Sequence, residues 1–587
     1  MTYKLNIEET EAAKRTGTWV ALKKLILILA KEKKNLIIAL LIILLNASLS
    51  LTGPFLIGHT IDSYVQTKQY HGVLLFSAIL LGTYIMALFT SYLQTKLMGG
   101  VAQRVLFNLR NAVFTKLQEL PITFFNENKA GDLISRINND TDKLNQFFSQ
   151  SLMQFIGSIF IMTGAGIFLL LINLPLGAAA LAPSLLILLF TRTMSPWVKQ
   201  VNARNLASTG SLSAEIQESL ANFKVVVAFN RRDYFMKRFE EVNKVNFDTA
   251  TKAGLANNLF MPVYTFLSHL GQLVVLAMGI YLISTGRFSI GLLISFLTYI
   301  TSFYNPLRQL AALWTNFQIA LAGWDRIGKI LKLENNLRIM ETAPERCDPS
   351  YIVFRHVSFT YPNGKEVLHN VSFELERSRT YAFVGPTGGG KTTMASLMAR
   401  LYDPVRGKIL LDGRDLRSYT PGERTRKIGF ILQEPILFTG TVKENIVYGN
   451  DALTDYSLDN LTAEMRNAGL DSLLERFENG LETRVQSSGE TISLGQKQLI
   501  AFMRAVLRKP EVLILDEATA NIDTITEQQL DIILRKLPET TTRVIIAHRL
   551  NTIENADEIF FVNSCQVIRA GSMDMAVELL MHGKGDS

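Results

Sequence analysis

Eight consecutive residues match in full the phosphate-binding pattern G-x-x-x-x-G-K-[ST]: Gly385, Pro386, Thr387, Gly388, Gly389, Gly390, Lys391 and Thr392. The glycines let backbone N–H groups curl round phosphate oxygens, Lys391 can reach the β- and γ-phosphates, and Thr392 can ligate Mg²⁺. The motif follows the apolar run 381–384 and, with Thr393, opens a helical run that continues to residue 401, which is the context it requires. A chance glycine-rich turn is the alternative, and it leaves this context unexplained. The pattern predicts that the chain binds ATP and Mg²⁺.

A second group of candidate residues follows the apolar run 512–515, which ends in Asp516 and Glu517. Asp516 is suited to hold Mg²⁺. Glu517 can polarise the water that attacks the γ-phosphate, which is a general-base role. An isolated pair of this kind is usually a solvated strand end, but this pair lies downstream of a complete phosphate loop. The two motifs together predict ATP hydrolysis.

The elements that must position these residues are short strands and helices. From Tyr351 onward, β-rich runs alternate with helical patterns and turn residues, which is typical of an α/β nucleotide-binding domain. The composition changes near Leu331, and the segment 331–350 has the composition of a linker. The predicted domains are therefore 1–330, a linker at 331–350, and 351–587.

The first 330 residues contain six apolar stretches long enough, or nearly so, to cross a bilayer, which takes about 20 residues. Five of them carry no Lys, Arg, Asp or Glu, and the sixth carries only Arg308. A soluble core helix can be this apolar once, but six such stretches favour lipid, as does a hydrophobic share of 48%. The predicted fold is a membrane domain of six helices fused to an α/β P-loop ATPase domain. The predicted spans are Leu36–Ile57, Val73–Leu93, Leu152–Ile172, Leu174–Phe190, Leu259–Ile283 and Ile290–Leu310.

Lys and Arg are distributed unevenly between the segments that join the spans. Segments 94–151 and 191–258 hold seven and ten of them, whereas 58–72, 173 and 284–288 hold only Lys68 and Arg287. Both chain ends and both long segments are therefore expected in the cytoplasm. Lys and Arg at the inner membrane face then account for the net charge of +8, and nucleic acid is not expected as a partner. No cleavable signal peptide and no disulfide framework are expected.

The two long cytoplasmic segments have helical rather than loop-like patterns. Segment 214–243, for example, repeats apolar residues at three- to four-residue spacing. The membrane helices are therefore expected to continue into the cytoplasm. Pro121 and Gly131 interrupt the first long segment, and a short transverse helix is predicted between them.

Taken together, these motifs resemble those of ATP-binding cassette (ABC) proteins, and residues 20–580 are similar to a half-transporter of the exporter type. Residues 121–125, 131–136 and Asp140 are similar to the family's first coupling region, and 218–229 to its second. The resemblance implies ATP-driven export by alternating access, with the chain as one half of a dimer in a lipid bilayer. The implied substrate is a small amphipathic molecule, drug or lipid.

The same resemblance implies roles for single residues of the ATPase half. Tyr361 resembles the aromatic residue that stacks on adenine, although a plain strand tyrosine is the alternative. Gln433 resembles the glutamine that senses Mg²⁺ and the attacking water. His548, after the apolar run 544–546, resembles the switch histidine at the γ-phosphate rather than a structural histidine. Asp523 resembles an aspartate of the dimer interface. The implied catalytic residues are Glu517, His548 and Gln433, and the implied metal ligands are Thr392, Gln433 and Asp516.

One segment departs from the family pattern. The signature Leu-Ser-Gly-Gly-Gln appears here as Ile492-Ser493-Leu494-Gly495-Gln496. Ser493, Gly495 and Gln496 are implied nucleotide contacts ahead of a helix whose N-terminus can face a phosphate. Leu494 replaces a glycine and needs room beside nucleotide held by the partner subunit. The chain therefore resembles the catalytically competent subunit of a heterodimeric exporter, and a homodimer that tolerates Leu494 is the alternative.

The residue types in the spans leave the substrate open. Polar and aromatic side chains there can line a cavity or join helices by hydrogen bonds: Tyr84, Gln154, Tyr264, His269, Gln272, Tyr299 and Tyr304. An importer or a peptide transporter on the same fold is an alternative function, and a regulator that uses ATP only as a ligand is another. The expected location is the inner (plasma) membrane of a bacterium, with the N-terminus and ATPase domain cytoplasmic.

Overall fold

The structure is a computed structural model of the chain. It describes residues 3, 5, 32–334, 337, 339–341, 350–362, 364–486, 492–516, 524–546, 556–563, 565–571 and 573–582. The chain divides into two compact units. A helical unit comprises residues 8–118 and 131–332, and an α/β unit comprises 1–7, 119–130 and 333–587.

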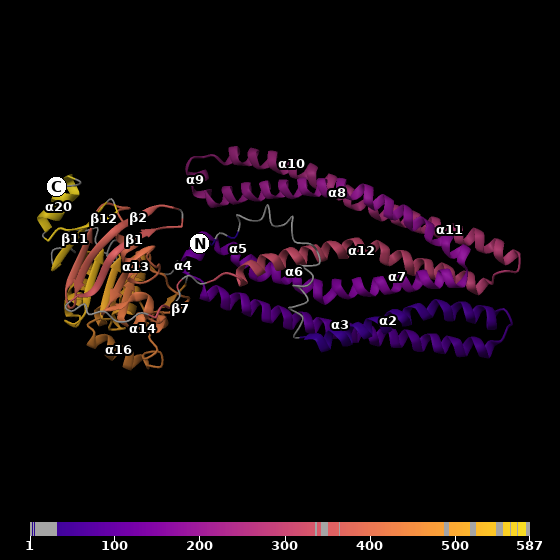
Figure 1. Cartoon of the computed structure of the whole chain (residues 1–587), viewed down its shortest axis with the longest axis horizontal. Helices are drawn as coiled ribbons and strands as arrows, with labels where there is room; N and C mark the ends of the chain where they lie inside the picture. Colours follow the sequence, from indigo (N-terminus) through magenta and orange to yellow (C-terminus); the bar gives the residue numbers. More distant parts are fainter. Residues whose placement is uncertain are drawn as a thin grey trace. The chain divides into compact units, whose positions relative to one another are not determined.

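The helical unit is built from long helices, several of which lie side by side (Figure 1). Residues 130–172 form one continuous helical segment because π-helical turns at Arg136–Asp140 and Phe147–Ser151 join its three helices. Pro183 lies inside one long helix without interrupting it. The helices are α2 (Lys33–Thr60), α3 (Tyr70–Glu119), α5 (Ala130–Ser135), α6 (Thr141–Gln146), α7 (Leu152–Ile172), α8 (Leu174–Ala221), α9 (Phe223–Ala228), α10 (Arg232–Asn258), α11 (Phe260–Ser284) and α12 (Ile290–Leu331).

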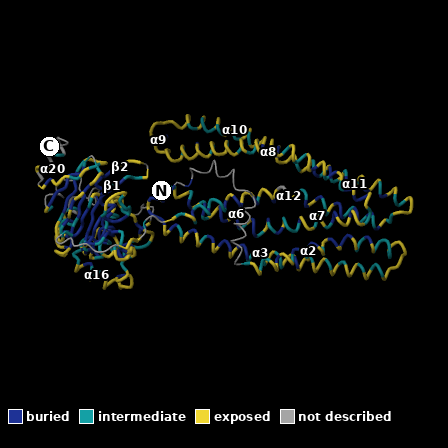
Figure 2. The backbone as a smooth tube through the Cα atoms, viewed as in Figure 1, coloured by how far each residue is buried: buried dark blue, intermediate teal, exposed yellow. Residues whose placement is uncertain are grey.

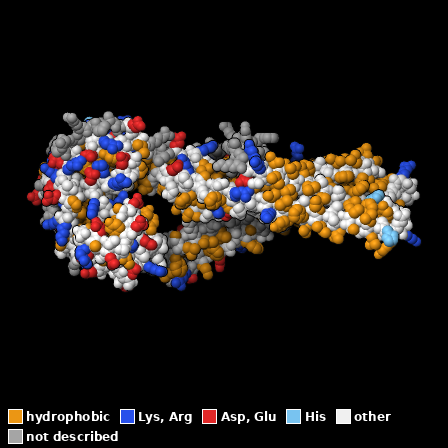
Figure 3. Space-filling model, turned by 90° about the horizontal axis from the view of Figure 1, so that it is seen from below, with side chains coloured by type: hydrophobic (Ala, Val, Ile, Leu, Met, Phe, Trp, Pro, Cys, Tyr) orange, Lys and Arg blue, Asp and Glu red, His pale blue; other side chains and the backbone are white. Residues whose placement is uncertain are grey.

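Six helical segments of the described chain are long and apolar enough to cross a membrane, and each contains one of the predicted spans. Helix α3 has 50 residues, which corresponds to about 75 Å at 1.5 Å per residue, against roughly 30 Å of hydrocarbon. The helices therefore continue well beyond the apolar stretches, as predicted. Many residues of α2, α3 and α11 are exposed (Figure 2), and many of them are large hydrophobic residues. Hydrophobic side chains cover much of the face seen from below, which is the side of α2 and α3 (Figure 3). Such a surface suits contact with lipid tails.

Three tyrosine hydroxyls join helices inside this unit. Tyr264 Oη lies 2.6 Å from Thr191 Oγ1, Tyr299 donates to Leu51 O at 2.7 Å, and Tyr304 donates to Ala180 O at 2.8 Å. The three tyrosines are buried. The sequence left open whether these tyrosines line a cavity or join helices by hydrogen bonds. The structure shows that they join helices.

Helices α2 and α12 approach closely near the start of α12. A Cβ atom at Gly58 would lie 2.6 Å from Gly291 O, so the two backbones meet where neither residue has a side chain. Asp62 accepts hydrogen bonds from Gly291 N at 2.8 Å and from the Ser289 hydroxyl. This carboxylate satisfies backbone and side-chain donors at the first turn of α12.

A buried ion pair holds α12 near its C-terminal end. Asp140 is 3% exposed and accepts two hydrogen bonds from Arg326, at 2.7 Å from Nε and 2.5 Å from Nη2. Lys143 Nζ adds a third at 3.1 Å. The bidentate geometry holds the carboxylate firmly, because a buried charge without its partner is costly. Within the helical unit, Asp140 therefore anchors the predicted first coupling region to α12.

The α/β unit contains two main sheets. An antiparallel sheet has the order β2-β1-β4-β5, and a six-stranded sheet has the order β12-β11-β3-β10-β9-β6, parallel except for β12. The strands are β1 (Ser350–Thr360), β2 (Glu366–Glu376), β3 (Thr380–Val384), β4 (Arg406–Leu411), β5 (Arg414–Asp415), β6 (Ile428–Ile431), β9 (Val512–Asp516), β10 (Thr542–Ile546), β11 (Glu558–Asn563) and β12 (Gln566–Arg569). The main helices are α13 (Lys391–Met398), α14 (Pro421–Lys427), α15 (Val442–Val447), α16 (Leu458–Asn467), α18 (Leu494–Val506), α19 (Thr524–Lys536) and α20 (Met573–His582).

The parallel strands determine where the predicted motifs meet. Strand β10 pairs in parallel with β3 on one side and with β9 on the other. The carboxyl ends of these three strands therefore lie at one edge of the sheet, which is where α/β proteins place their ligands. The phosphate loop follows β3, and Asp516 ends β9. The strands themselves are almost fully buried between two apolar clusters.

A short helix from the first half of the chain belongs to this unit. Helix α4 (Ile122–Glu127) is the predicted transverse helix, and it follows Pro121. Asn126 Nδ2 donates a hydrogen bond to Tyr402 Oη at 2.8 Å. Burial raises the pKa of Tyr402, with a further contribution from the neighbouring Tyr361. The Tyr402 hydroxyl thus accepts a hydrogen bond from a residue of the first half of the chain.

Candidate functional site

The loop after β3 is shaped by glycines that no other residue can replace without strain. Gly385, Gly388 and Gly390 have φ angles of +147°, +82° and +114°. A Cβ atom at Gly385 would lie 2.1 Å from Val562 O, inside van der Waals contact. Gly390 precedes α13 and offers no side chain to cap it, so the first N–H groups of the helix are open to an anion. The loop is therefore a cradle of backbone donors.

The side chain of one buried lysine completes this cradle. Lys391 is 4% exposed, and its Nζ donates to Gly385 O at 2.8 Å and to Pro386 O at 3.0 Å. The ammonium group therefore lies under the loop, on the side of its carbonyl groups. A buried ammonium group needs such partners, and phosphate oxygens would supply stronger ones.

Thr392 and Asp516 meet although they are far apart in the sequence. Thr392 Oγ1 donates to Asp516 Oδ1 at 3.1 Å, and Asp516 is 1% exposed. A hydroxyl and a carboxylate side by side offer the hard oxygen ligands that Mg²⁺ prefers, together with phosphate oxygens. The residues present therefore fit this ion.

A cavity opens over the loop and α13. Its walls bring the predicted Tyr361 and Gln433 to the phosphate loop. Tyr361 Oη lies 3.0 Å from Thr393 Oγ1, and its ring meets the ring of Tyr402 edge-on at 5.5 Å. The lining residues are Tyr361, Lys365, Val367, Thr387, Gly388, Gly390, Lys391, Thr392, Thr393 and Gln433.

The predicted signature residues do not line this cavity. Ser493 caps α18: its Oγ accepts from Gln496 N at 3.2 Å, and Gln496 Oε1 accepts from Ser493 N at 2.8 Å. Leu494 begins the helix and is 45% exposed. One chain alone therefore leaves Ser493, Gly495 and Gln496 away from the loop, which is compatible with a contact to nucleotide on another subunit.

Comparison with known proteins identifies the family. The ABC transporter transmembrane region matches residues 36–307, and the ABC transporter family matches 368–520. A fatty acid ABC transporter ATP-binding/permease protein of Mycobacterium bovis is 34% identical over 84% of this chain and 78% of its own. A multidrug resistance ABC transporter ATP-binding and permease protein of Lactococcus lactis subsp. lactis is 30% identical over 84% of this chain and 83% of its own. The chain belongs to the ABC transporter family. In structure it is similar to a bacterial Atm1-family ABC exporter solved with ATP bound, with a TM-score of 0.76, 25% identity and coverage of 94% of this chain and 96% of that one.

These matches confirm the predicted fold and enzyme class. This ABC transporter is of the exporter type: six membrane-crossing helices are joined in one chain to an ATP-binding domain that hydrolyses ATP to drive transport. Proteins of this kind function as dimers in a membrane.

Three residues implied by the resemblance lie outside the described part of this transporter: Glu517, Asp523 and His548. Glu517 directly follows Asp516, and His548 follows β10 by two residues. Their roles therefore remain predictions.

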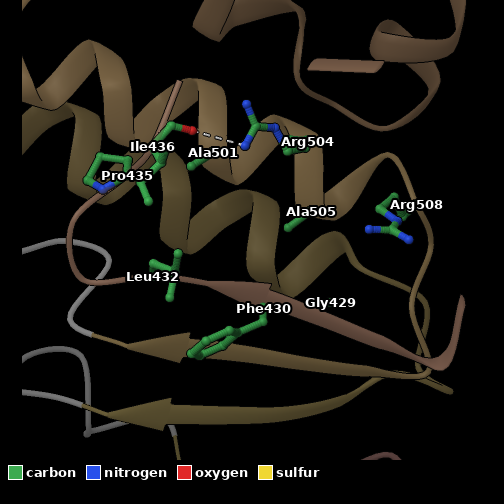
Figure 4. Close-up of a pocket in the computed structure, with 9 residues that line it drawn as sticks. All are labelled: Gly429, Phe430, Leu432, Pro435, Ile436, Ala501, Arg504, Ala505 and Arg508. Carbon is green, nitrogen blue, oxygen red and sulfur yellow. Dashed lines mark hydrogen bonds between the residues drawn. The ribbon is translucent and has the colours of Figure 1, made fainter. Parts of the chain in front are cut away.

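No motif or spacing in the sequence predicts a groove beside Gln433 in this ABC transporter. It lies between α18 and the segment that follows β6, and Arg504 spans it (Figure 4). Arg504 donates to Asn445 O at 2.7 Å and to Ile436 O at 3.2 Å, and burial lowers its pKa. Leu432 and Ile436 remain exposed at the groove. Arg504 therefore fixes the segment that carries Gln433, through bonds that join residues distant in sequence.

Proposed function

We propose that this ABC exporter moves a small amphipathic molecule, drug or lipid, out of the cytoplasm across a bacterial inner membrane by alternating access. Two relatives are named for fatty acids and for multidrug resistance, and both are amphipathic substrate classes. The distribution of Lys and Arg supports a cytoplasmic N-terminus and ATPase domain, with domains at 1–330 and 351–587 and a linker at 331–350.

One series of contacts carries this proposal. Tyr361 lies in the nucleotide cavity, bonded to Thr393 of α13, and its ring meets that of Tyr402. Tyr402 in turn accepts the hydrogen bond from Asn126 of α4, which directly follows the membrane helix α3. A shift of the nucleotide site can therefore reach α3 through four packed residues. Transport by ATP requires such a connection.

The site residues then divide the work of hydrolysis. Backbone donors of residues 385–390 and Lys391 hold the phosphates, and Tyr361 stacks on adenine. Thr392, Asp516 and Gln433 would hold Mg²⁺, which would supply positive charge beside the phosphates. Glu517 orients and polarises the attacking water, and His548 contacts the γ-phosphate. Ser493, Gly495 and Gln496 face the nucleotide of the second subunit.

Transport into inside-out membrane vesicles tests the direction. We expect ATP to drive accumulation of a fluorescent amphipathic probe inside such vesicles, because their exposed face is the former cytoplasmic face. The measurement is probe retained with ATP against probe retained with a non-hydrolysable analogue. ATP-driven loss of preloaded probe from the vesicles would show import and contradict the proposal.

We further propose that the dimer is a heterodimer with a related half-transporter. Leu494 is exposed where the family has a glycine, so its side chain would occupy space beside the partner's nucleotide. The purified chain alone is therefore expected to hydrolyse ATP slowly. Leu494→Gly is expected to raise its turnover about tenfold or more, which corresponds to lowering the activation free energy by only about 1.4 kcal/mol.

The measurement is phosphate release from the purified, membrane-reconstituted chain. Leu458→Gly removes a similarly exposed leucine from the first position of α16 and is the matched control, expected to leave turnover unimproved. Fast turnover by the unaltered chain alone would show that a homodimer tolerates Leu494.

A further inference from the structure

A polar surface remains exposed on the membrane-crossing part of α11 and α12. We call it the polar face, and it consists of His269, Gln272, Thr301, Asn305 and Arg308. His269, Thr301 and Asn305 are exposed, and Gln272 and Arg308 are half-buried. His269 Nδ1 lies 3.1 Å from Gln272 Oε1, Gln272 Nε2 donates to Thr301 Oγ1 at 3.3 Å, and Arg308 Nη2 donates to Asn305 Oδ1 at 3.4 Å.

Helical spacing explains why these residues share one side. Thr301, Asn305 and Arg308 are at positions i, i+4 and i+7 of α12, so they extend over about 10 Å of one helix face. The tyrosines Tyr299 and Tyr304 of the same helix are buried and bonded to other helices. Apart from the bond between Gln272 and Thr301, which joins α11 and α12, the polar face is therefore distinct from the residues that hold the bundle together.

Polar groups in membrane segments face a bundle interior or a water-filled cavity rather than lipid, because hydrocarbon offers them no partners. The polar face has no such cover within the described part of the chain. Its exposure therefore indicates a cavity that opens when two half-transporters assemble.

The charge of this face is one-sided. The six predicted spans contain no Asp, Glu or Lys, and Arg308 is their only Arg. Among the described residues, no carboxylate pairs with Arg308, which donates its hydrogen bond to the neutral Asn305. A second copy of this chain would add another Arg308 and no carboxylate from its spans. The face therefore requires a counter-charge from elsewhere.

We propose that the polar face binds the anionic head group of an amphipathic substrate, a carboxylate or a phosphate. This inference rests on the proposed export function. Arg308 supplies a fork of donors that matches either group, and Asn305, Thr301 and Gln272 supply neutral hydrogen bonds. Phe266 and Leu273 are exposed on α11 next to His269 in helical spacing, and they offer apolar contact to the tail.

Three probes with the same twelve-carbon tail test the charge preference: laurate, dodecyltrimethylammonium and dodecyl maltoside. The full chain, with its partner subunit if one is needed for turnover, is reconstituted in nanodiscs, and ATPase stimulation is titrated with each probe. Laurate is expected to act at a concentration about tenfold or more below that of the cationic probe. Acetate, an anion without a tail, is expected to have no effect.

Variants locate the effect. Arg308→Gln is expected to raise the half-maximal laurate concentration about tenfold and to leave dodecyl maltoside unchanged, because a charge-assisted bond is lost. Arg308→Lys keeps the charge and is expected to retain the preference for laurate. Arg287→Gln removes the same charge from the loop before α12 and is the matched control, with no change expected.

Three results with the probes would overturn the inference: equal ATPase stimulation by the cationic and anionic probes, an equal loss of stimulation by all probes in Arg308→Gln, or stimulation by acetate. Dissociation of the dimer in Arg308→Gln would also overturn it, because the face would then be a subunit contact. If Arg308→Gln does not fold, the comparison of probes on the unaltered protein and on Arg308→Lys decides the question. Absence of ATP-driven probe movement in vesicles would instead refute export itself, so the two failures are distinguishable.

Discussion

Replacing Lys391 with alanine is expected to lower ATP affinity and turnover by about ten- to a hundredfold. The Nζ group is buried and bonded to Gly385 O and Pro386 O, so it is already positioned at the centre of the phosphate cradle. Alanine removes a charge-assisted contact worth roughly 1.5–3 kcal/mol to the phosphates and leaves two carbonyl groups without their donor. Binding of a fluorescent ATP analogue and phosphate release measure the two effects.

Lys365→Ala is the matched control for this change. Lys365 lines the same cavity but is exposed to solvent, so loss of its charge is screened and is expected to cost only a few-fold in affinity. An unchanged affinity and turnover in Lys391→Ala, or an equal loss in both variants, would contradict the assignment of the phosphate loop.

Glu517→Gln is expected to keep ATP binding and to lower hydrolysis about 10²- to 10⁴-fold. The residue follows Asp516, which ends β9 and accepts the hydrogen bond from Thr392. Glutamine has the same size but cannot accept the proton of the attacking water. Nucleotide affinity and phosphate release, measured on the same preparation, separate the two steps.

Asp516→Asn provides the contrast. This change removes a predicted Mg²⁺ ligand, so it is expected to weaken Mg²⁺-dependent nucleotide binding as well as hydrolysis. If Glu517→Gln instead released phosphate at a near-normal rate, or lost binding to the same extent as Asp516→Asn, another residue would have to act as the base.

Those parts of the site that depend on local order could be predicted. The cradle requires a strand, a glycine-rich turn and a helix in succession, and all three are contiguous between Thr380 and Met398. The pairing of Thr392 with Asp516 follows from parallel strands whose ends share an edge, which alternating β and α patterns already imply. Local sequence order does not predict the positions of Tyr361 and Gln433. Only the family resemblance indicated a role for them, and the structure places both in the wall of the cavity.

Contacts between distant segments had no signal in the sequence. Asn126 and Tyr402 are 276 positions apart, and Asp140 and Arg326 are 186 apart. Asp140 belongs to the segment that resembles the family's first coupling region, but no periodic pattern or motif links it to Arg326 or links Asn126 to Tyr402, so the sequence does not predict either pairing. Arg504 and the groove beside Gln433 escaped prediction for the same reason.

The sequence by itself determined that the chain crosses a membrane six times and holds a nucleotide, because span length, charge distribution and the phosphate loop are local properties of consecutive residues. Only the tertiary structure decided what the polar residues of the spans do. Tyr264, Tyr299 and Tyr304 point into helix contacts, whereas His269 and Thr301 lie exposed on one face. The physical reason is that a helix presents every direction to its surroundings, and neighbouring helices, not residue type, determine which directions are covered.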